Sequence, residues 1–252
     1  MTASAQPSPS PSPRAAPGRV PWVDYAKGWS IVLVVSMHSA LGVGVALDET
    51  GWLHPLVAFA KPFRMPDFFL VAGLFLGRAI AAPWRDFLDR KVIHFVYFFA
   101  LWTFIMLAAK GAGFGLRDPL GMMSAFLRAL VDPFSSLWFV QLLPLLFVAA
   151  RLARDLPAPV SLGAAVALHL AAAFFPDGGR YAMGSNMTGW MTLDSFCLFY
   201  VYFLIGHLAR EAIFAFAQQV ERRRGAALGG LVLWALAQQG AVTFGLAEIP
   251  GL

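Results

Sequence analysis

Charged side chains are scarce in this chain. Only 13% of its 252 residues are Asp, Glu, Lys or Arg, whereas 59% are hydrophobic, and the mean hydropathy is +0.66. Soluble domains usually carry about 25% charged residues, so a water-soluble globule of this composition would have too little polar surface to cover itself. The composition therefore predicts a protein that lies in a membrane.

Cysteine and several catalytic motifs are also missing. Cys197 is the one cysteine, which excludes a disulfide within the chain and a cysteine-rich zinc cluster. The sequence lacks the phosphate-binding GxxxxGK[ST] loop, the GxSxG nucleophile elbow and the HExxH zinc motif. These absences give no support to known soluble nucleotide and hydrolase chemistries, and we expect neither a metal site nor a bound cofactor.

Long apolar stretches, by contrast, are abundant. Residues 1–18 are rich in Ser and Pro and are expected to form a disordered tail. The next stretch, residues 29–47, is uncharged, and a helix of that length reaches about 28 Å, close to the thickness of the hydrocarbon core. Backbone groups must be paired in lipid, which favours helices. We therefore predict an all-α, polytopic transmembrane helical bundle with about seven spans, at residues 29–47, 63–80, 92–109, 134–150, 159–175, 187–209 and 226–247.

The basic residues indicate an orientation. If the N-terminus is cytoplasmic, 13 of the 19 Lys and Arg residues fall in inside segments and four in outside segments. This asymmetry agrees with the positive-inside rule. The basic balance of the chain is then explained by topology, and we expect membrane lipids rather than nucleic acid as its surroundings.

One histidine lies at membrane depth. His38 is near the middle of the first apolar stretch, and Lys27 precedes it by eleven residues, or about 16 Å of helix, on roughly the same side. Asp24 stands three residues before Lys27 on that face. Ionisable groups in a span are costly, so His38 is a candidate functional residue. A neutral histidine bonded to a neighbouring helix is the alternative.

Residues 61–67 (KPFRMPD) combine two prolines with three charges, Lys61, Arg64 and Asp67. Proline removes a helical hydrogen bond, so we expect a broken helix here. Broken backbone at membrane depth is tolerated where it lines a cavity, which makes the three charged residues candidates for substrate binding. A structural ion pair between Arg64 and Asp67 is the alternative.

A base-rich stretch precedes the third span, on the predicted cytoplasmic side. It contains Arg85, Arg90 and Lys91. Positive-inside anchoring explains such a stretch, but Arg and Lys also suit phosphate groups. Elsewhere we expect a helix–helix hydrogen bond from His169 and an interfacial or re-entrant helix over residues 119–131.

Four segments together resemble the integral-membrane acyltransferase 3 family. They are Lys27 and His38 with ten residues between them, residues 68–73 (FFLVAG), the Arg90-Lys91 pair followed by His94, and residues 137–139 (LWF). The sequences of residues 62–70 (PFRMPDFFL) and 89–95 (DRKVIHF) resemble those of a bacterial inner-membrane subgroup of this family. Lys stands at 27 where Arg is commoner, and Ala stands at 72 where Ser is frequent. Members of the family are longer, so residues 19–252 are expected to form an incomplete acyltransferase-3-like membrane domain.

The resemblance implies transfer of an acyl group, typically acetyl, from acyl-CoA to a hydroxyl of an envelope carbohydrate or a lipid-linked acceptor. His38 would be the base or nucleophile, with Lys27 and Asp67 beside it in the catalytic set. Substrate would contact Asp24, Lys61, Arg64, Arg85, Arg90 and Lys91. Two other functions remain open at this point: a secondary transporter with its site at broken helices, and an inactive membrane scaffold.

Overall fold

Helices form the regular structure of this protein throughout the part of the chain that the computed structural model describes, residues 20–111, 118–133, 136–174 and 187–245. No strand occurs in these ranges, so the all-α prediction is confirmed. In chain order the elements are α1 (Pro21–Leu47), α2 (His54–Gly73), α3 (Leu76–Ala81), α4 (Trp84–Leu88), the π-helix η1 (Asp89–Ile93), α5 (His94–Lys110), α6 (Pro119–Val131), α7 (Trp138–Leu152), α8 (Ala158–Phe174), α9 (Met191–Leu208), α10 (Arg210–Arg222) and α11 (Arg224–Thr243). The tail over residues 1–18 lies outside the described residues.

Seven of these helices correspond to the seven predicted spans. Four are long and apolar enough to cross a membrane by length and composition: α1, the continuous helix from α4 to α5, α9 and α11. Helices α7 and α8 are apolar but shorter, and α2 carries the three charges of residues 61–67. The remaining apolar helix, α6, has the bounds predicted for an interfacial helix. The structure is therefore compatible with a polytopic helical bundle.

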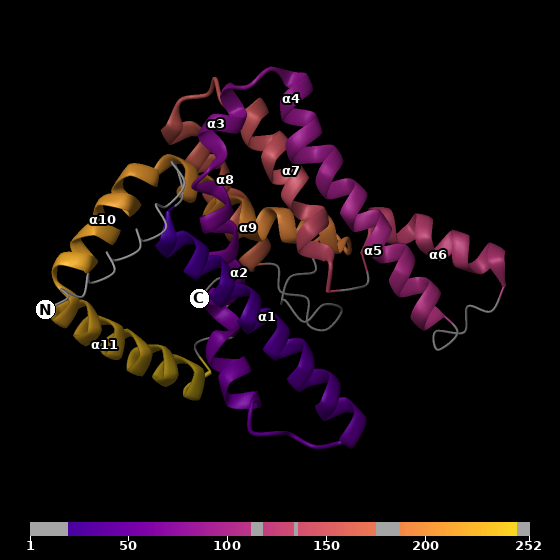
Figure 1. Ribbon diagram of the computed structural model, residues 1–252, viewed down its shortest axis with the longest axis horizontal. Coiled ribbons are helices and arrows are strands. Elements are labelled where there is room, and N and C mark those ends of the chain that lie inside the picture. Colours follow the sequence, from indigo (N-terminus) through magenta and orange to yellow (C-terminus); the bar gives the residue numbers. More distant parts are fainter. Residues whose placement is uncertain (1–19, 112–117, 134–135, 175–186, 246–252) are drawn as a thin grey trace, which may run out of the picture.

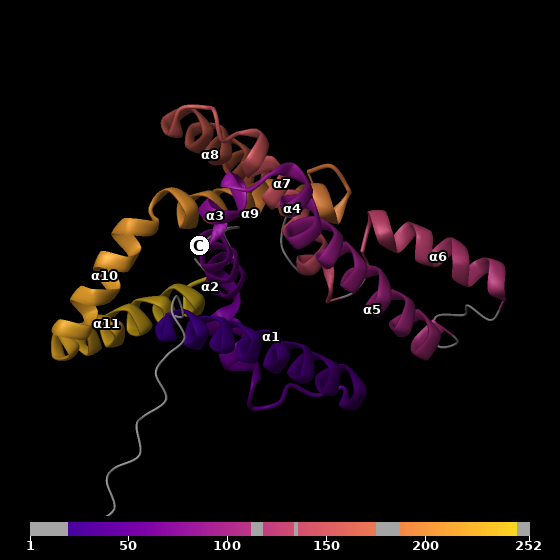
Figure 2. The same cartoon turned by 45° about the horizontal axis from the view of Figure 1, so that its top comes forward.

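Helix α9 is the centre of the fold. It lies between α7, α8 and α2 in Figure 1, and ten of its residues are buried. Its Phe199 ring packs 5.0 Å from that of Phe69 on α2, and its Phe203 ring packs 5.2 Å from that of Phe147 on α7. Helix α6 and the pair α10–α11 extend to opposite sides of this core in both views (Figures 1 and 2).

Two glycines allow α2 and α9 to cross at close range. A Cβ on Gly73 would overlap the carbonyl oxygen of Phe203, and a Cβ on Gly206 would overlap the carbonyl oxygen of Leu70. Backbones approach this closely in membranes where small residues stand at the crossing. The contact fixes α2, which carries Lys61, Arg64 and Asp67, against the centre of the bundle.

The prediction of a broken helix at residues 61–67 is wrong. The helix is continuous from His54 to Gly73 and contains both Pro62 and Pro66. Each proline removes one backbone hydrogen bond, but the bonds on either side remain and keep the helix in register. The interruption comes later, at Leu74 and Phe75, before α3 begins. The second span therefore lies nearer the N-terminus than the apolar stretch 63–80 indicated.

Candidate functional site

The side chain of His38 faces a cavity of about 450 Å³. Helix α1 contributes His38 with Ser30 and Ser39, and α2 contributes Met65 and Phe68. The third wall comes from the residues that lead into α7, and the complete lining is Ser30, Ile31, Val34, Val35, His38, Ser39, Met65, Phe68, Ser136, Leu137 and Phe139. The cavity thus joins three segments that lie far apart in the sequence: the histidine helix, the FFLVAG segment and the LWF segment.

Aromatic contacts hold these walls together. The rings of Phe68 and Phe139 meet edge to face at 5.3 Å, and Trp138 packs 5.7 Å from Phe199 of α9. Because Trp138 is buried against α9, the neighbouring Leu137 and Phe139 are left to line the cavity. The LWF segment therefore has two tasks, anchoring α7 with its tryptophan and shaping the cavity beside His38.

Arg64 is a buried cation next to this cavity. Its side chain is 7% exposed, and Nε and Nη1 have no hydrogen-bond partner in the structure. Its charge lies close enough to interact with the imidazole of His38. Within the described residues no ion pair joins Arg64 to Asp67, which is exposed on the same helix, as is Lys61. Buried guanidinium N–H groups without acceptors are costly, so Arg64 is suited to meet an oxygen of a ligand.

Two lysines converge at the predicted cytoplasmic end of the same region. Lys27 on α1 places its ammonium 4.8 Å from the ring centre of Phe75, and Lys91 on η1 lies 4.6 Å from that of Phe147. The two ammonium groups are near enough to repel each other. Asp24 lies one helical turn before Lys27 and is exposed. Two like charges held close together attract an anion.

The basic stretch before α5 does not act as one cluster. Lys91 turns inward to Phe147, as described above, whereas Arg90 is exposed and lines a separate hollow with Asp89 and His94. Arg85, at the start of α4, is exposed too. The structure therefore brings Lys27 and Lys91 together and places Arg90 elsewhere.

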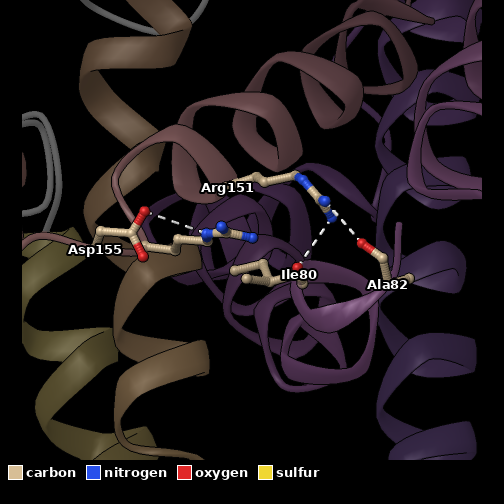
Figure 3. Close-up of polar contacts among 5 residues, drawn as sticks. Ile80, Ala82, Arg151 and Asp155 are labelled. Carbon is tan, nitrogen blue, oxygen red and sulfur yellow. Dashed lines mark hydrogen bonds and ion pairs between the residues drawn. The ribbon is translucent and has the colours of Figure 1, made fainter. Parts of the chain in front are cut away.

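Arg151 is a buried residue that sequence reasoning assigned only to topology. It is 3% exposed, and its Nη1 donates to the carbonyl oxygens of Ala79 at 3.1 Å and Ile80 at 2.9 Å, while Nη2 donates to that of Ala82 at 2.7 Å. Figure 3 shows the guanidinium reaching the end of α3, apart from the exposed Arg154–Asp155 pair.

The same guanidinium stacks on two aromatic rings. Its central carbon lies 4.3 Å from the ring centre of Trp84 and 4.6 Å from that of Phe87. Arg151 thereby joins the end of α3 to α4, the helix that leads into η1 and Lys91. A signal for this role was the aromatic pair in residues 84–87, because arginine stacks on aromatic faces.

Two other polar residues of the spans, His169 and Asp194, have structural partners. Nδ1 of His169 on α8 donates to the carbonyl of Leu198 on α9 at 2.9 Å, so the predicted helix–helix hydrogen bond is confirmed. Asp194 accepts hydrogen bonds from the backbone and the hydroxyl of Thr188 at 2.9 and 2.8 Å. At the cavity, His38 and Arg64 are the ionisable pair.

Comparison with known proteins identifies the family. Residues 20–251 match the acyltransferase 3 family, whose shared unit is described as an acyltransferase domain. The chain belongs to this family. It is similar to the inner membrane protein YcfT of Escherichia coli (strain K12), at 26% identity over 235 residues. That match covers 84% of this chain and 62% of the relative. No solved structure matches the chain.

These findings confirm the resemblance noted from the four motifs. The chain is a member of a membrane acyltransferase family, and its curated relative is a bacterial inner-membrane protein. Helices capable of spanning a membrane are present as well.

Proposed function

We propose that this protein transfers an acyl group, typically acetyl, from acyl-CoA to a hydroxyl of an envelope carbohydrate or of a lipid-linked acceptor, in the inner membrane. The observation that carries the proposal is the cavity at His38. Three of the four motif segments typical of the family line it, and the buried Arg64 lies beside it. A group-transfer site needs a base and a cation for developing negative charge in one place.

His38 acts as the general base in this proposal. Its imidazole takes the proton of the acceptor hydroxyl while the hydroxyl oxygen attacks the thioester carbonyl carbon. The carbonyl electrons move to oxygen, and an N–H of Arg64 stabilises that oxyanion. The carbon–sulfur bond then breaks, the imidazolium returns the proton to the departing thiolate, and an ester and free CoA result. Asp67, one turn from Arg64, orients the acceptor.

The donor approaches from the cytoplasmic side. Lys27 and Lys91 provide two neighbouring positive charges for the phosphates of CoA. Lys27 stands about 16 Å along α1 from His38, so an extended arm would connect phosphates bound at the lysines to a thioester in the cavity. The arm of CoA would therefore lie along α1, between the two lysines and the thioester at His38. Asp24, Lys61 and Arg85 remain as predicted substrate contacts.

Acyl transfer by the purified full chain in lipid nanodiscs tests the proposal. Radiolabelled acetyl-CoA is supplied with a bacterial envelope glycolipid extract, and label in the extract is counted together with free CoA thiol. His38→Ala should lower transfer by roughly 100-fold or more, the usual contribution of a general base. His54→Ala, a histidine at the outer α1–α2 turn that does not line the cavity, is the matched control. Full activity in His38→Ala would refute the base assignment.

The donor site has its own test in the same assay. Lys27→Gln and Lys91→Gln should raise KM for acetyl-CoA several-fold and change kcat less, because each removes a phosphate contact far from the reacting atoms. Unchanged KM in both variants would remove the lysines from donor binding.

The other two functions receive less support. The transporter interpretation depended on a helix broken at Pro62 and Pro66, and α2 is continuous there. A membrane scaffold would release no CoA thiol in the wild-type assay, which is the result that would favour it over the enzyme.

A further inference from the structure

The neighbouring bases Arg90 and Lys91 face different surroundings. Lys91 lies over the ring of Phe147 inside the bundle, whereas Arg90 is exposed. They stand in the π-helix η1, where the backbone N–H of His94 bonds to the carbonyl of Asp89, five residues back. Single π-turns inside α-helices frequently occur at functional sites. Arg90 therefore does not lie with Lys27 and Lys91, the lysines proposed to bind acyl-CoA, and its role has to be explained separately.

Arg90 lines a hollow of about 490 Å³ on the outside of the bundle. The other lining residues are Asp89, Ile93, His94 and Tyr97. The hollow therefore presents a carboxylate and a guanidinium side by side, with an imidazole and a phenol at its edge. Among the residues that the structure describes, no ion pair joins Asp89 to Arg90. Both charges are accordingly available to a ligand that carries one charge of each sign.

The helix beyond this hollow has an apolar outer face. Ile93 is 59% exposed, Val96 48% and Tyr97 60%. Phe98 and Leu101 continue this face, and the His94 ring packs 4.8 Å from that of Phe98. These residues belong to the 27-residue helix Trp84–Lys110, which is long and apolar enough to span the membrane. The outer face of α5 is thus lipid-facing, with the polar hollow at its predicted cytoplasmic end.

We propose that this hollow binds the headgroup of a phospholipid of the phosphoethanolamine type. A polar hollow above an apolar helix face matches the shape of a phospholipid, whose headgroup and acyl chains need these surroundings in this order. Arg90 takes the phosphate, for which a guanidinium is well suited, and Asp89 takes the ammonium. Tyr97, which also lines the hollow, is of a residue type that is enriched at membrane interfaces. Ile93 and Val96 contact the upper part of an acyl chain.

Lipid retention by the purified full chain tests this assignment. The protein is incubated in mild detergent with phosphatidylethanolamine or phosphatidylglycerol, and bound lipid is measured by native mass spectrometry. Wild type should retain phosphatidylethanolamine in preference. Arg90→Gln should weaken that retention about fivefold, the effect of one basic residue at a lipid surface. Arg78→Gln makes the same charge change at an exposed position of α3 outside the hollow, and should retain lipid as wild type does.

The charge on Asp89 distinguishes the two headgroups. Asp89→Asn should remove the preference for phosphatidylethanolamine, because the ammonium loses its partner. The proposal is overturned if wild type prefers phosphatidylglycerol, if Asp89→Asn keeps the original preference, or if Arg78→Gln and Arg90→Gln reduce retention equally. No acyl donor takes part in this measurement, so its result is independent of the proposed acyl transfer. A loss of acetyl-CoA affinity in Arg90→Gln with unchanged lipid retention would return Arg90 to the donor site.

Discussion

The crossing of α2 and α9 supports a quantitative prediction about Gly206. In Gly206→Ala the new Cβ would overlap the carbonyl oxygen of Leu70 and would lie 2.9 Å from its carbonyl carbon and 3.2 Å from its Cα. These are backbone atoms of a packed helix, so the two helices must move apart. Overpacking of this kind costs about 1–3 kcal/mol. Alanine also gains about 0.5–1 kcal/mol over glycine in a helix, which partly offsets the cost.

A second glycine, where an added Cβ meets no atom, allows the steric cost in Gly206→Ala to be measured separately from the gain in helix propensity. Gly163 lies within α8, and a Cβ there would meet nothing within 4 Å. Gly163→Ala should therefore stabilise the protein by about 0.5–1 kcal/mol. The difference between the two variants equals the cost of the overlap, about 1–3 kcal/mol.

The assay is reversible unfolding in mixed detergent micelles, followed by helical circular dichroism. Gly206→Ala should unfold at a lower denaturant fraction than wild type, and Gly163→Ala at a higher one. Equal stabilisation of both variants would show that α2 and α9 do not cross at this distance. Because α2 carries Arg64, Met65 and Phe68, separation of the helices should also displace these side chains at the cavity and lower acyl transfer.

Three further predictions concern other contacts. Arg151→Lys should lower the free energy of unfolding by about 1.5–3 kcal/mol, since an ammonium lacks the planar fork that reaches the α3 carbonyls and stacks on Trp84; thermal unfolding that matches wild type would contradict this. His169→Phe should cost about 0.6 kcal/mol through loss of the bond between α8 and α9, and an unchanged denaturant midpoint would rule that bond out as a stabilising contact. An alkaline phosphatase fused after Leu47 should be active and one fused after Lys91 inactive, as an N-terminus in the cytoplasm requires; the reverse activities would invert the topology.

The helical spans could be predicted from the sequence because the cost of unpaired backbone in lipid leaves few alternatives. Six of the seven predicted apolar stretches overlap closely with helices, from α1 to α11. The second was displaced because Lys61, Arg64 and Asp67 lower the hydropathy of the helix that they belong to. Hydropathy measures transfer to lipid, whereas Arg64 is buried in protein. Hydropathy therefore placed the second span at residues 63–80, shifted toward the C-terminus relative to the charged helix that packs there, α2.

The cavity at His38 was only partly predictable. Spacing along one helix related His38 to Lys27, since helical geometry is regular. The contribution of Leu137 and Phe139 depends on the burial of Trp138 against α9, which is a contact between segments about sixty residues apart. The same limit applies to Arg64, whose proximity to His38 depends on how α1 and α2 pack.

Arg151 and Arg154 illustrate what charge counting leaves undecided. The positive-inside rule treats both as equivalent cytoplasmic anchors, because it depends on charge and depth alone. In the structure Arg154 pairs with Asp155 at 3.3 Å on the surface, with 44% of its side chain exposed, whereas Arg151 is buried against Trp84 and the end of α3. The difference follows from their positions at the end of α7, one facing the bundle and one facing solvent. A base at a membrane interface can therefore orient the chain and also hold two neighbouring helices together, and only packing distinguishes the residue that does both.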